Sequence, residues 1–137
     1  KVLVSKIEDL YNNSIKPQAQ THSEASYCYK IKKDDTYLKF NTSAEEVLGK
    51  IKAFSPNPGA KCFLDGELIK VLDAKIEDNI KFNQKIGCVI DESLLISCKY
   101  GLIRLIKIQR AGRRAMMVRE FLNGRKVKIG SLINEKK

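Results

Sequence analysis

Short apolar segments separated by turn-forming residues follow one another from residue 61 to residue 109, and this spacing restricts the fold strongly. Asp65-Gly66 indicates a two-residue hairpin, because glycine accepts the positive φ that such a turn needs. Asp91-Glu92 and Tyr100-Gly101 mark two further turns. The predicted strands are Lys61–Leu64, Glu67–Lys75, Gly87–Ile90, Leu94–Lys99 and Leu102–Gln109. Five short strands spaced by turns are typical of a small antiparallel barrel.

The last predicted strand does not alternate cleanly, because Leu105 and Ile106 are adjacent apolar residues. A β-bulge there, or burial on both faces, would explain the pattern. Between the second and third strands, Asp78–Lys85 is polar and predicts a loop.

Two short helices are expected beside the strands. Ser43 and Glu46 have the spacing of a capping box, in which each side chain satisfies a backbone amide at the start of a helix. This first helix must end near Phe54, because Pro56 cannot continue it. The second helix is predicted from apolar residues at helical spacing, which are Met117, Val118, Phe121 and Leu122, with Gly124 as its stop. Residues 125–133 are basic and then apolar, and would add a sixth, closing strand.

The amino-terminal third has a different character. Residues 2–13 carry Leu3, Ile7 and Leu10 at helical spacing, which predicts a short amphipathic helix. Such a helix is marginal alone, so we expect residues 1–13 to belong to the end of a preceding domain. Residues 14–36 are polar and irregular, as in an interdomain linker, and residues 37–137 would form the barrel domain. Because the chain opens at Lys1, we interpret it as part of something longer.

The four cysteines and the one histidine do not form a metal-binding pattern. Cys28, Cys62, Cys88 and Cys98 include no C-x-x-C pair, and His22 stands alone in a polar stretch, so no metal site is predicted. Buried free thiols are the simplest interpretation. No run of eighteen apolar residues is present, so no transmembrane helix is expected.

The charge is concentrated in one segment. Residues 1–98 hold 14 Lys/Arg and 14 Asp/Glu, whereas residues 99–128 hold 10 Lys/Arg and one acid, Glu120. That segment alone carries +9 of the total of +10. A block of one sign on a folded domain points to a polyanionic partner, and guanidinium groups suit phosphate oxygens. The alternatives are an acidic membrane surface and a solvated basic rim that serves solubility.

The candidate phosphate-binding residues fall into three groups. The first lies on the last predicted strand and the loop after it, and comprises Arg104, Lys107, Arg110, Arg113 and Arg114. The second comprises Arg125, Lys126 and Lys128. The third, weaker group comprises Lys30, Lys32 and Lys33, which Asp34 and Asp35 follow directly. Tyr100, at a predicted hairpin tip, is a candidate for stacking on a base, although a merely exposed tyrosine explains it as well.

Two sequence patterns resemble a known family. Ile51-Lys52-Ala53-Phe54 with Pro56, Pro58, Gly59 and Ala60, and Ala111-Gly112-Arg113-Arg114 with Met116, Phe121-Leu122 and Gly124, resemble the carboxy-terminal domain of methionyl-tRNA formyltransferases. The resemblance covers roughly residues 15–133. Met117 departs from it, since the family usually has Ser or Thr there, which would cap the following helix.

The resemblance implies an OB-like barrel that binds initiator methionyl-tRNA. It places the catalytic Asn, His and Asp, and the donor 10-formyltetrahydrofolate, in an amino-terminal catalytic domain that is absent from this chain. It therefore implies no catalytic residue, cofactor or metal here, and a monomeric protein of the cytoplasm or an organellar matrix, without a membrane role.

Two other functions are compatible with the fold. A stand-alone RNA-binding OB module would have no need of the helix and linker before Lys30. The middle domain of a formyltetrahydrofolate hydrolase or dehydrogenase would have no tRNA to bind, and the +9 segment argues against it.

Overall fold

A computed structural model describes residues 2–16, 18–77 and 85–134 of the chain. The predicted loop at Asp78–Lys85 lies outside the described residues except for Lys85. Backbone contacts divide the chain into two units, Lys1–Lys30 and Ile31–Lys137, which are described separately. No helix in the described ranges combines the length and apolar character that a membrane span requires.

The first unit contains one helix and an irregular stretch. Helix α1 (Val2–Tyr11) is followed by a single turn of 3-10 helix, η1 (His22–Glu24). None of the residues of α1 is buried, and Leu3 and Ile7 remain 69% and 58% exposed. The amphipathic helix is therefore present, and its packing against a preceding domain stays a prediction.

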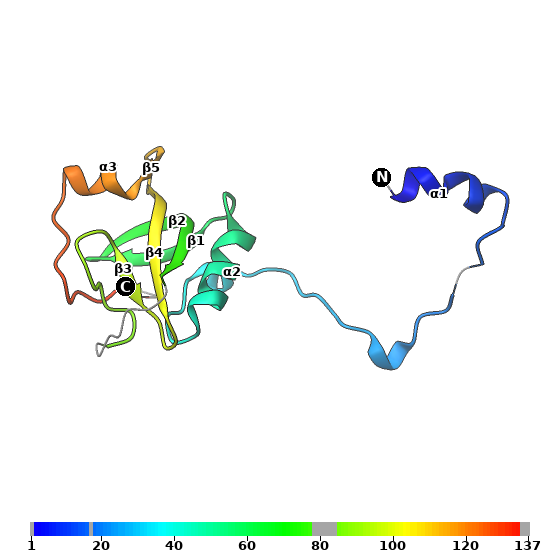
Figure 1. Cartoon of the computed structure of the whole chain (residues 1–137), viewed down its shortest axis with the longest axis horizontal. Coiled ribbons are helices and arrows are strands. Elements are labelled where there is room, and N and C mark those ends of the chain that lie inside the picture. Colours follow the sequence, from blue (N-terminus) through cyan, green and yellow to red (C-terminus); the bar gives the residue numbers. More distant parts are fainter. Residues whose placement is uncertain (1, 17, 78–84, 135–137) are drawn as a thin grey trace. The chain divides into compact units, whose positions relative to one another are not determined.

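The second unit is built on one antiparallel sheet, as the sequence predicted (Figure 1). Its strands are β1 (Ala60–Leu64), β2 (Glu67–Glu77), β3 (Leu95–Ser97), β4 (Leu102–Arg110) and β5 (Ala115–Met117). Their order is β1-β2-β4-β3, and β5 pairs with β4 beyond the end of β3. The fold class, mainly β with short helices and barrel-like, is confirmed.

The sheet is not closed, and isolated bridges span the gap between β1 and β3. Phe63 of β1 bridges to Asn134, Cys88 bridges to Leu132, and Val89 bridges to Ile96 of β3. Two predicted strands are thus wrong as strands: Gly87–Ile90 and residues 125–133 contribute single bridges only. Leu94 also departs from its predicted strand, because its φ of 58° is incompatible with extended backbone.

The irregularity predicted at Leu105-Ile106 is a β-bulge that involves both central strands. Asp73 pairs with Lys107 and Ala74 pairs with Leu105, so Ile106 is left out of the register, as is Leu72 on β2. Leu105 and Ile108 both face the core although they are three residues apart, where a regular strand would place inward residues two apart. The bulge increases the local twist that a barrel needs.

Three helices complete the unit. The 3-10 helix η2 (Lys33–Thr36) precedes the sheet, α2 (Ala44–Phe54) packs against β1, β2 and β4, and α3 (Val118–Asn123) packs against β4 and β5. Ser43 caps α2, accepting the N–H of Glu46 at 3.3 Å, which is the serine half of the predicted capping box. Helix α3 begins one residue later than Met117, because Ala115–Met117 pair with β4 as strand β5. Gly124 follows α3 with a φ of −108°, so the helix ends without a left-handed residue.

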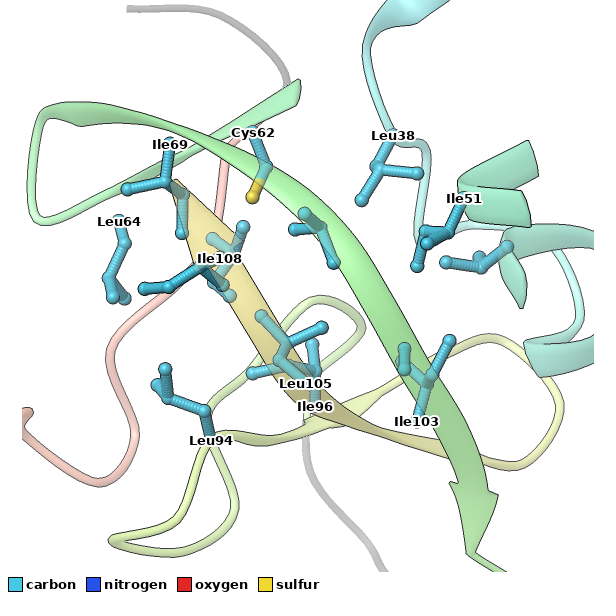
Figure 2. Packing of buried hydrophobic residues seen from close by; sticks show 14 of the residues in the cluster. Leu38, Ile51, Cys62, Leu64, Ile69, Leu94, Ile96, Ile103, Leu105 and Ile108 are labelled. Carbon is cyan, nitrogen blue, oxygen red and sulfur yellow. The ribbon is translucent and has the colours of Figure 1, made fainter. Parts of the chain in front are cut away.

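Aliphatic side chains of the sheet and of α2 form a single core (Figure 2). Ile69, Ile103 and Ile108 on the central strands are fully buried, and α2 contributes Ala44, Val47 and Ile51. Cys62, Cys88 and Cys98 are buried as predicted, but the prediction is wrong for Cys28, which is exposed.

Candidate nucleic-acid interface

Three of the predicted phosphate-binding arginines are already paired with carboxylates. The Arg104 guanidinium donates to Glu77 at 2.8 Å and to Asp91 at 2.9 Å, and its side chain is 20% exposed. These hydrogen bonds, first that to the Asp91 carboxylate, raise the pKa of Arg104. At Asp91 burial opposes ionisation, but the hydrogen bonds from Arg104 and from the Leu95 and Ser93 amides lower the pKa overall. Arg104 is therefore a structural cation that joins β4 to the turn before β3.

Arg110 and Arg125 share one carboxylate, that of Glu67. Arg110 Nε and Arg125 Nη1 each donate to Glu67 at 2.5 Å, and Arg125 also reaches Asp65 at 3.3 Å. Both guanidinium groups lie over the ring of Phe121, with centroid distances of 5.9 and 5.5 Å. The hydrogen bond from Arg110 is the main reason why the pKa of Glu67 is lowered. We call Glu67, Arg110, Arg125, Asp65 and Phe121 the Glu67 cluster.

Arg113 and Arg114 occupy the tip of a hairpin between β4 and β5, where the sequence predicted only a loop. The Arg113 N–H donates to the Arg110 carbonyl at 3.1 Å, and the Gln109 side chain donates to the Arg113 carbonyl at 2.9 Å. Gly112 has a φ of 67°, which a type II turn requires at its third residue. Both arginine side chains are exposed, and neither has an ion pair with another described residue.

Two lysines that the sequence analysis did not select extend this hairpin across the sheet. Lys61 of β1 pairs with Lys70 of β2, Lys70 pairs with Gln109 of β4, and Gln109 pairs with Ala115 of β5. Directly paired residues lie on the same face, and neighbours on these strands such as Cys62 and Ile69 point into the core. Lys61 and Lys70 therefore lie on the outer face, at a strand spacing of about 4.8 Å. Strand alternation was the signal that identifies them.

Lys107 lies on the same outer face as this row. It stands two residues before Gln109, with the buried Ile108 between them, and it pairs with Asp73 and Met117. We call the exposed or half-exposed cations Lys61, Lys70, Lys107, Arg113 and Arg114 the outer row.

The remaining predicted cations lie after α3 or before the sheet. Lys126 and Lys128 are exposed on either side of the buried Val127. Lys33 begins η2, and the Lys32 N–H donates to the Asp35 carboxylate at 2.7 Å, so acidic neighbours surround this pair. Lys30 is the last residue of the first unit, whereas the other candidate cations belong to the second unit.

No group of three or more His, Cys, Asp or Glu side chains within the described ranges is placed to hold a metal ion. Burial raises the pKa of the Cys62 thiol to about 12, so this thiol is not an activated nucleophile. Glu67, Glu77 and Asp91, whose pKa values are lowered, accept hydrogen bonds from arginines and are therefore acceptors in ion pairs. The chemistry that this surface supports is the binding of anions.

The outer row and the sheet beneath it define a class of protein: a small, mainly β, barrel-like domain with a cationic outer face. The chain belongs to the family of formyl transferase C-terminal domains, which matches residues 30–126.

Similar proteins are named methionyl-tRNA formyltransferase. One from Campylobacter jejuni is 37% identical over 131 residues, covering 93% of this chain and 41% of that protein. One from Natranaerobius thermophilus is 30% identical over 136 residues, covering 95% and 44%. One from Pelagibacter ubique is 31% identical over 132 residues, covering 96% and 42%. The chain thus spans about two fifths of the length of these relatives.

Solved structures of HypX from Aquifex aeolicus share the fold. One HypX variant matches with a TM-score of 0.63 at 20% identity, covering 92% of this chain and 24% of that one. HypX in complex with tetrahydrofolic acid matches with a TM-score of 0.63 at 18% identity, covering 94% and 26%. At this identity the likeness concerns the fold alone.

Proposed function

We propose that this domain holds the backbone of initiator methionyl-tRNA within a methionyl-tRNA formyltransferase. An amino-terminal catalytic domain outside this chain would transfer the formyl group from 10-formyltetrahydrofolate to the methionyl amine, in the cytoplasm or an organellar matrix. The names of the relatives support this proposal, as does the chain's coverage of about two fifths of their length. The described residues offer charged groups for binding and none for the transfer.

The outer row is the observation that carries the proposal. Lys61 and Lys70 lie side by side across β1 and β2, and the row continues through β4 to the exposed Arg113 and Arg114. Cations spaced along one face can meet successive phosphates, and each contact releases condensed counterions. Pairing between strands fixes the row, so its geometry exists before RNA arrives and less ordering entropy is lost on binding.

The two alternative functions predict different ligands. A stand-alone RNA-binding module would bind initiator and elongator tRNAs alike. The middle domain of a formyltetrahydrofolate hydrolase or dehydrogenase would bind neither. A titration of the chain with both tRNAs, repeated over a range of salt concentrations, separates the three.

The double substitution Arg113→Ala with Arg114→Ala tests the interface directly. Charge-assisted contacts from both arginines would make tRNA binding weaker by about 1–3 kcal/mol when they are lost. The slope of log affinity against log salt would also become shallower, by about 0.7 for each phosphate contact removed. Filter binding measures both quantities.

A matched control is Lys39→Ala with Lys52→Ala, which removes two exposed cations that lie outside the outer row. We expect this variant to bind within twofold of the unsubstituted chain. Equal losses in the two double variants would show that only total charge matters, and unchanged affinity without Arg113 and Arg114 would remove the hairpin from the interface.

A further inference from the structure

Glu67 lies where two separate cationic segments meet. One of its arginine partners, Arg110, ends β4 and belongs to the base of the hairpin, 43 residues away in sequence. The other, Arg125, follows α3 and lies 58 residues away. A single carboxylate therefore fastens two segments that are distant along the chain. Since Glu67 is the first residue of β2, the carboxylate is anchored to the central sheet.

Each arginine is joined directly to exposed cations. The carbonyl of Arg110 accepts the N–H of Arg113, so the position of Arg110 sets where the turn bearing Arg113 and Arg114 begins. Arg125 immediately precedes Lys126, and its own N–H donates to the Leu122 carbonyl at the end of α3. A shift of either guanidinium would thus move exposed cations that themselves have no ion pair to the described residues.

Phe121 makes the arrangement stiffer than two simple ion pairs. The ring is 95% buried as part of the core, and both guanidinium groups lie over it while they bind Glu67. Planar guanidinium groups that are stacked and hydrogen-bonded together have little freedom to rotate. By register, Arg110 lies opposite the buried Ile69, so the Glu67 cluster covers the end of the core where the central strands stop.

We propose that Glu67 is a positioning residue for RNA binding, which fixes the spacing between the hairpin cations Arg113 and Arg114 and the cations Lys126 and Lys128. This inference rests on the proposed function. It adds that the fixed spacing of the two sets of cations distinguishes a folded RNA from a flexible one. A rigid spacing fits a structured backbone of matching shape. A flexible single strand adapts to any spacing and responds mainly to the number of free cations.

The substitution Glu67→Gln separates these two contributions. It removes one negative charge and replaces the charge-assisted hydrogen bonds of two guanidinium groups with at most weaker ones to an amide oxygen, while Arg125 keeps its ion pair with Asp65, so total electrostatic attraction for RNA rises. It also loosens both cationic segments, so the fixed spacing is lost. We expect binding of folded initiator tRNA to become about fivefold weaker, while binding of a single-stranded homopolymer such as poly(U) becomes tighter. These two changes have opposite signs.

Glu77→Gln is the matched control. Glu77 ends the same strand β2 that Glu67 begins, and it also pairs with an arginine, Arg104, and with a lysine, Lys75. The substitution changes the net charge by the same amount but leaves the Glu67 cluster intact. We expect Glu77→Gln to bind both RNAs slightly more tightly.

A local structural measurement complements the binding data. Because Arg110 would no longer be held, the Arg113 amide should exchange its hydrogen faster in Glu67→Gln than in Glu77→Gln, while amides in the centre of β2 exchange alike in both. Equal hydrogen exchange at the central amides of β2 in the two variants would show that Glu67→Gln is folded. A loss of tRNA binding would then result from the local change around Glu67.

The possible outcomes distinguish failure of the inference from failure of the proposed function. If the unsubstituted chain does not bind tRNA, the proposed function fails. If it binds tRNA and Glu67→Gln resembles Glu77→Gln on both RNAs, charge alone governs binding and the inference is overturned. If Glu67→Gln weakens binding of both RNAs equally, Glu67 has no part in distinguishing them and the inference is overturned as well.

Discussion

Five of the six arginines of the basic segment, all except Arg119, fall into two groups that differ in what surrounds them. Arg104, Arg110 and Arg125 are held by carboxylates and keep side-chain exposures between 20% and 41%. Arg113 and Arg114 are exposed at the hairpin tip. The formal charge of residues 99–128 therefore overstates the cations that are free to meet phosphate. The first group stabilises the domain, and the second group, with Lys61 and Lys70, forms the surface available to a ligand.

The paired carboxylates predict a loss of stability in acid. The pKa values of Glu67 and Glu77 are lowered from their ordinary value of 4.5, mainly by hydrogen bonds from Arg110 and Lys75 respectively. A group whose pKa is lower in the folded state stabilises the fold above its ordinary pKa, and this contribution is lost as pH falls through the folded-state pKa. We expect the urea midpoint to fall as pH decreases below 4.5.

A double variant, Glu67→Gln with Glu77→Gln, provides the comparison. At neutral pH this variant should be less stable than the unsubstituted chain. As the pH falls through the ordinary carboxylate range, its free energy of unfolding should decline less than that of the unsubstituted chain. An equally steep decline in both proteins would show that other groups cause the acid sensitivity.

The boundary between β5 and α3 lies one residue after the helix start that the sequence predicted. Helical spacing of Met117, Val118, Phe121 and Leu122 predicted a helix from Met117, but Ala115–Met117 pair with Gln109–Lys107 of β4. Strand pairing with a distant partner is invisible to local periodicity, so it overrides the helical pattern at its first residue. Met117 then becomes the residue before α3, with a φ of −69° and a ψ of 147° and no side-chain hydrogen bond to cap the helix.

Replacing Met117 should therefore reveal the missing cap. Met117→Ser supplies an oxygen that can accept an N–H of the first turn of α3, whereas Met117→Ala removes the same packing without supplying it. We expect the serine variant to be more stable than the alanine variant by about 1 kcal/mol, measured by urea unfolding. Equal stabilities would mean that the first-turn amides of α3 are already satisfied.

Local signals predicted the elements whose causes are local. The Asp65-Gly66 turn has φ values of 48° and 78°, as a two-residue hairpin needs, and Ser43 caps α2. The bulge at Ile106 was visible as a break in alternation. The partners of Gly87–Ile90 were not predictable, because the bridges to this segment come from Ile96 and from Leu132, at the far end of the domain.

The candidate interface was predicted only in outline, because contacts between residues distant in sequence decide which cations are exposed. The concentration of positive charge pointed to the right part of the chain, and Arg113 and Arg114 are exposed there. Whether a given arginine is free depends on contacts between strands, such as Arg110 with Glu67, that only the register brings together. Lys61 and Lys70 were missed because each stands alone in the sequence and joins the outer row only through pairing.

At the scale of the whole domain, the isolated bridges leave the fold dependent on a short piece of chain at residues 131–134. The N–H and the carbonyl of Phe63 both bond to Asn134, at 2.9 and 3.0 Å, and Ile133 is 95% buried. Ending the chain after Gly130 should cost at least about 2 kcal/mol, through the lost burial of Ile133.

The same truncation would leave the amide and the carbonyl of Phe63 bare on the outer side of β1, although the Lys61 carbonyl would still accept the Leu38 N–H. Bare groups on a strand edge are the template on which sheets of separate molecules join. We therefore expect light scattering to detect dimers and larger species of the chain that ends after Gly130, and single molecules of one that ends after Asn134. A monomeric shorter chain would contradict this expectation. Residues 131–134 would thus prevent self-association of the domain, in addition to covering the edge of its sheet.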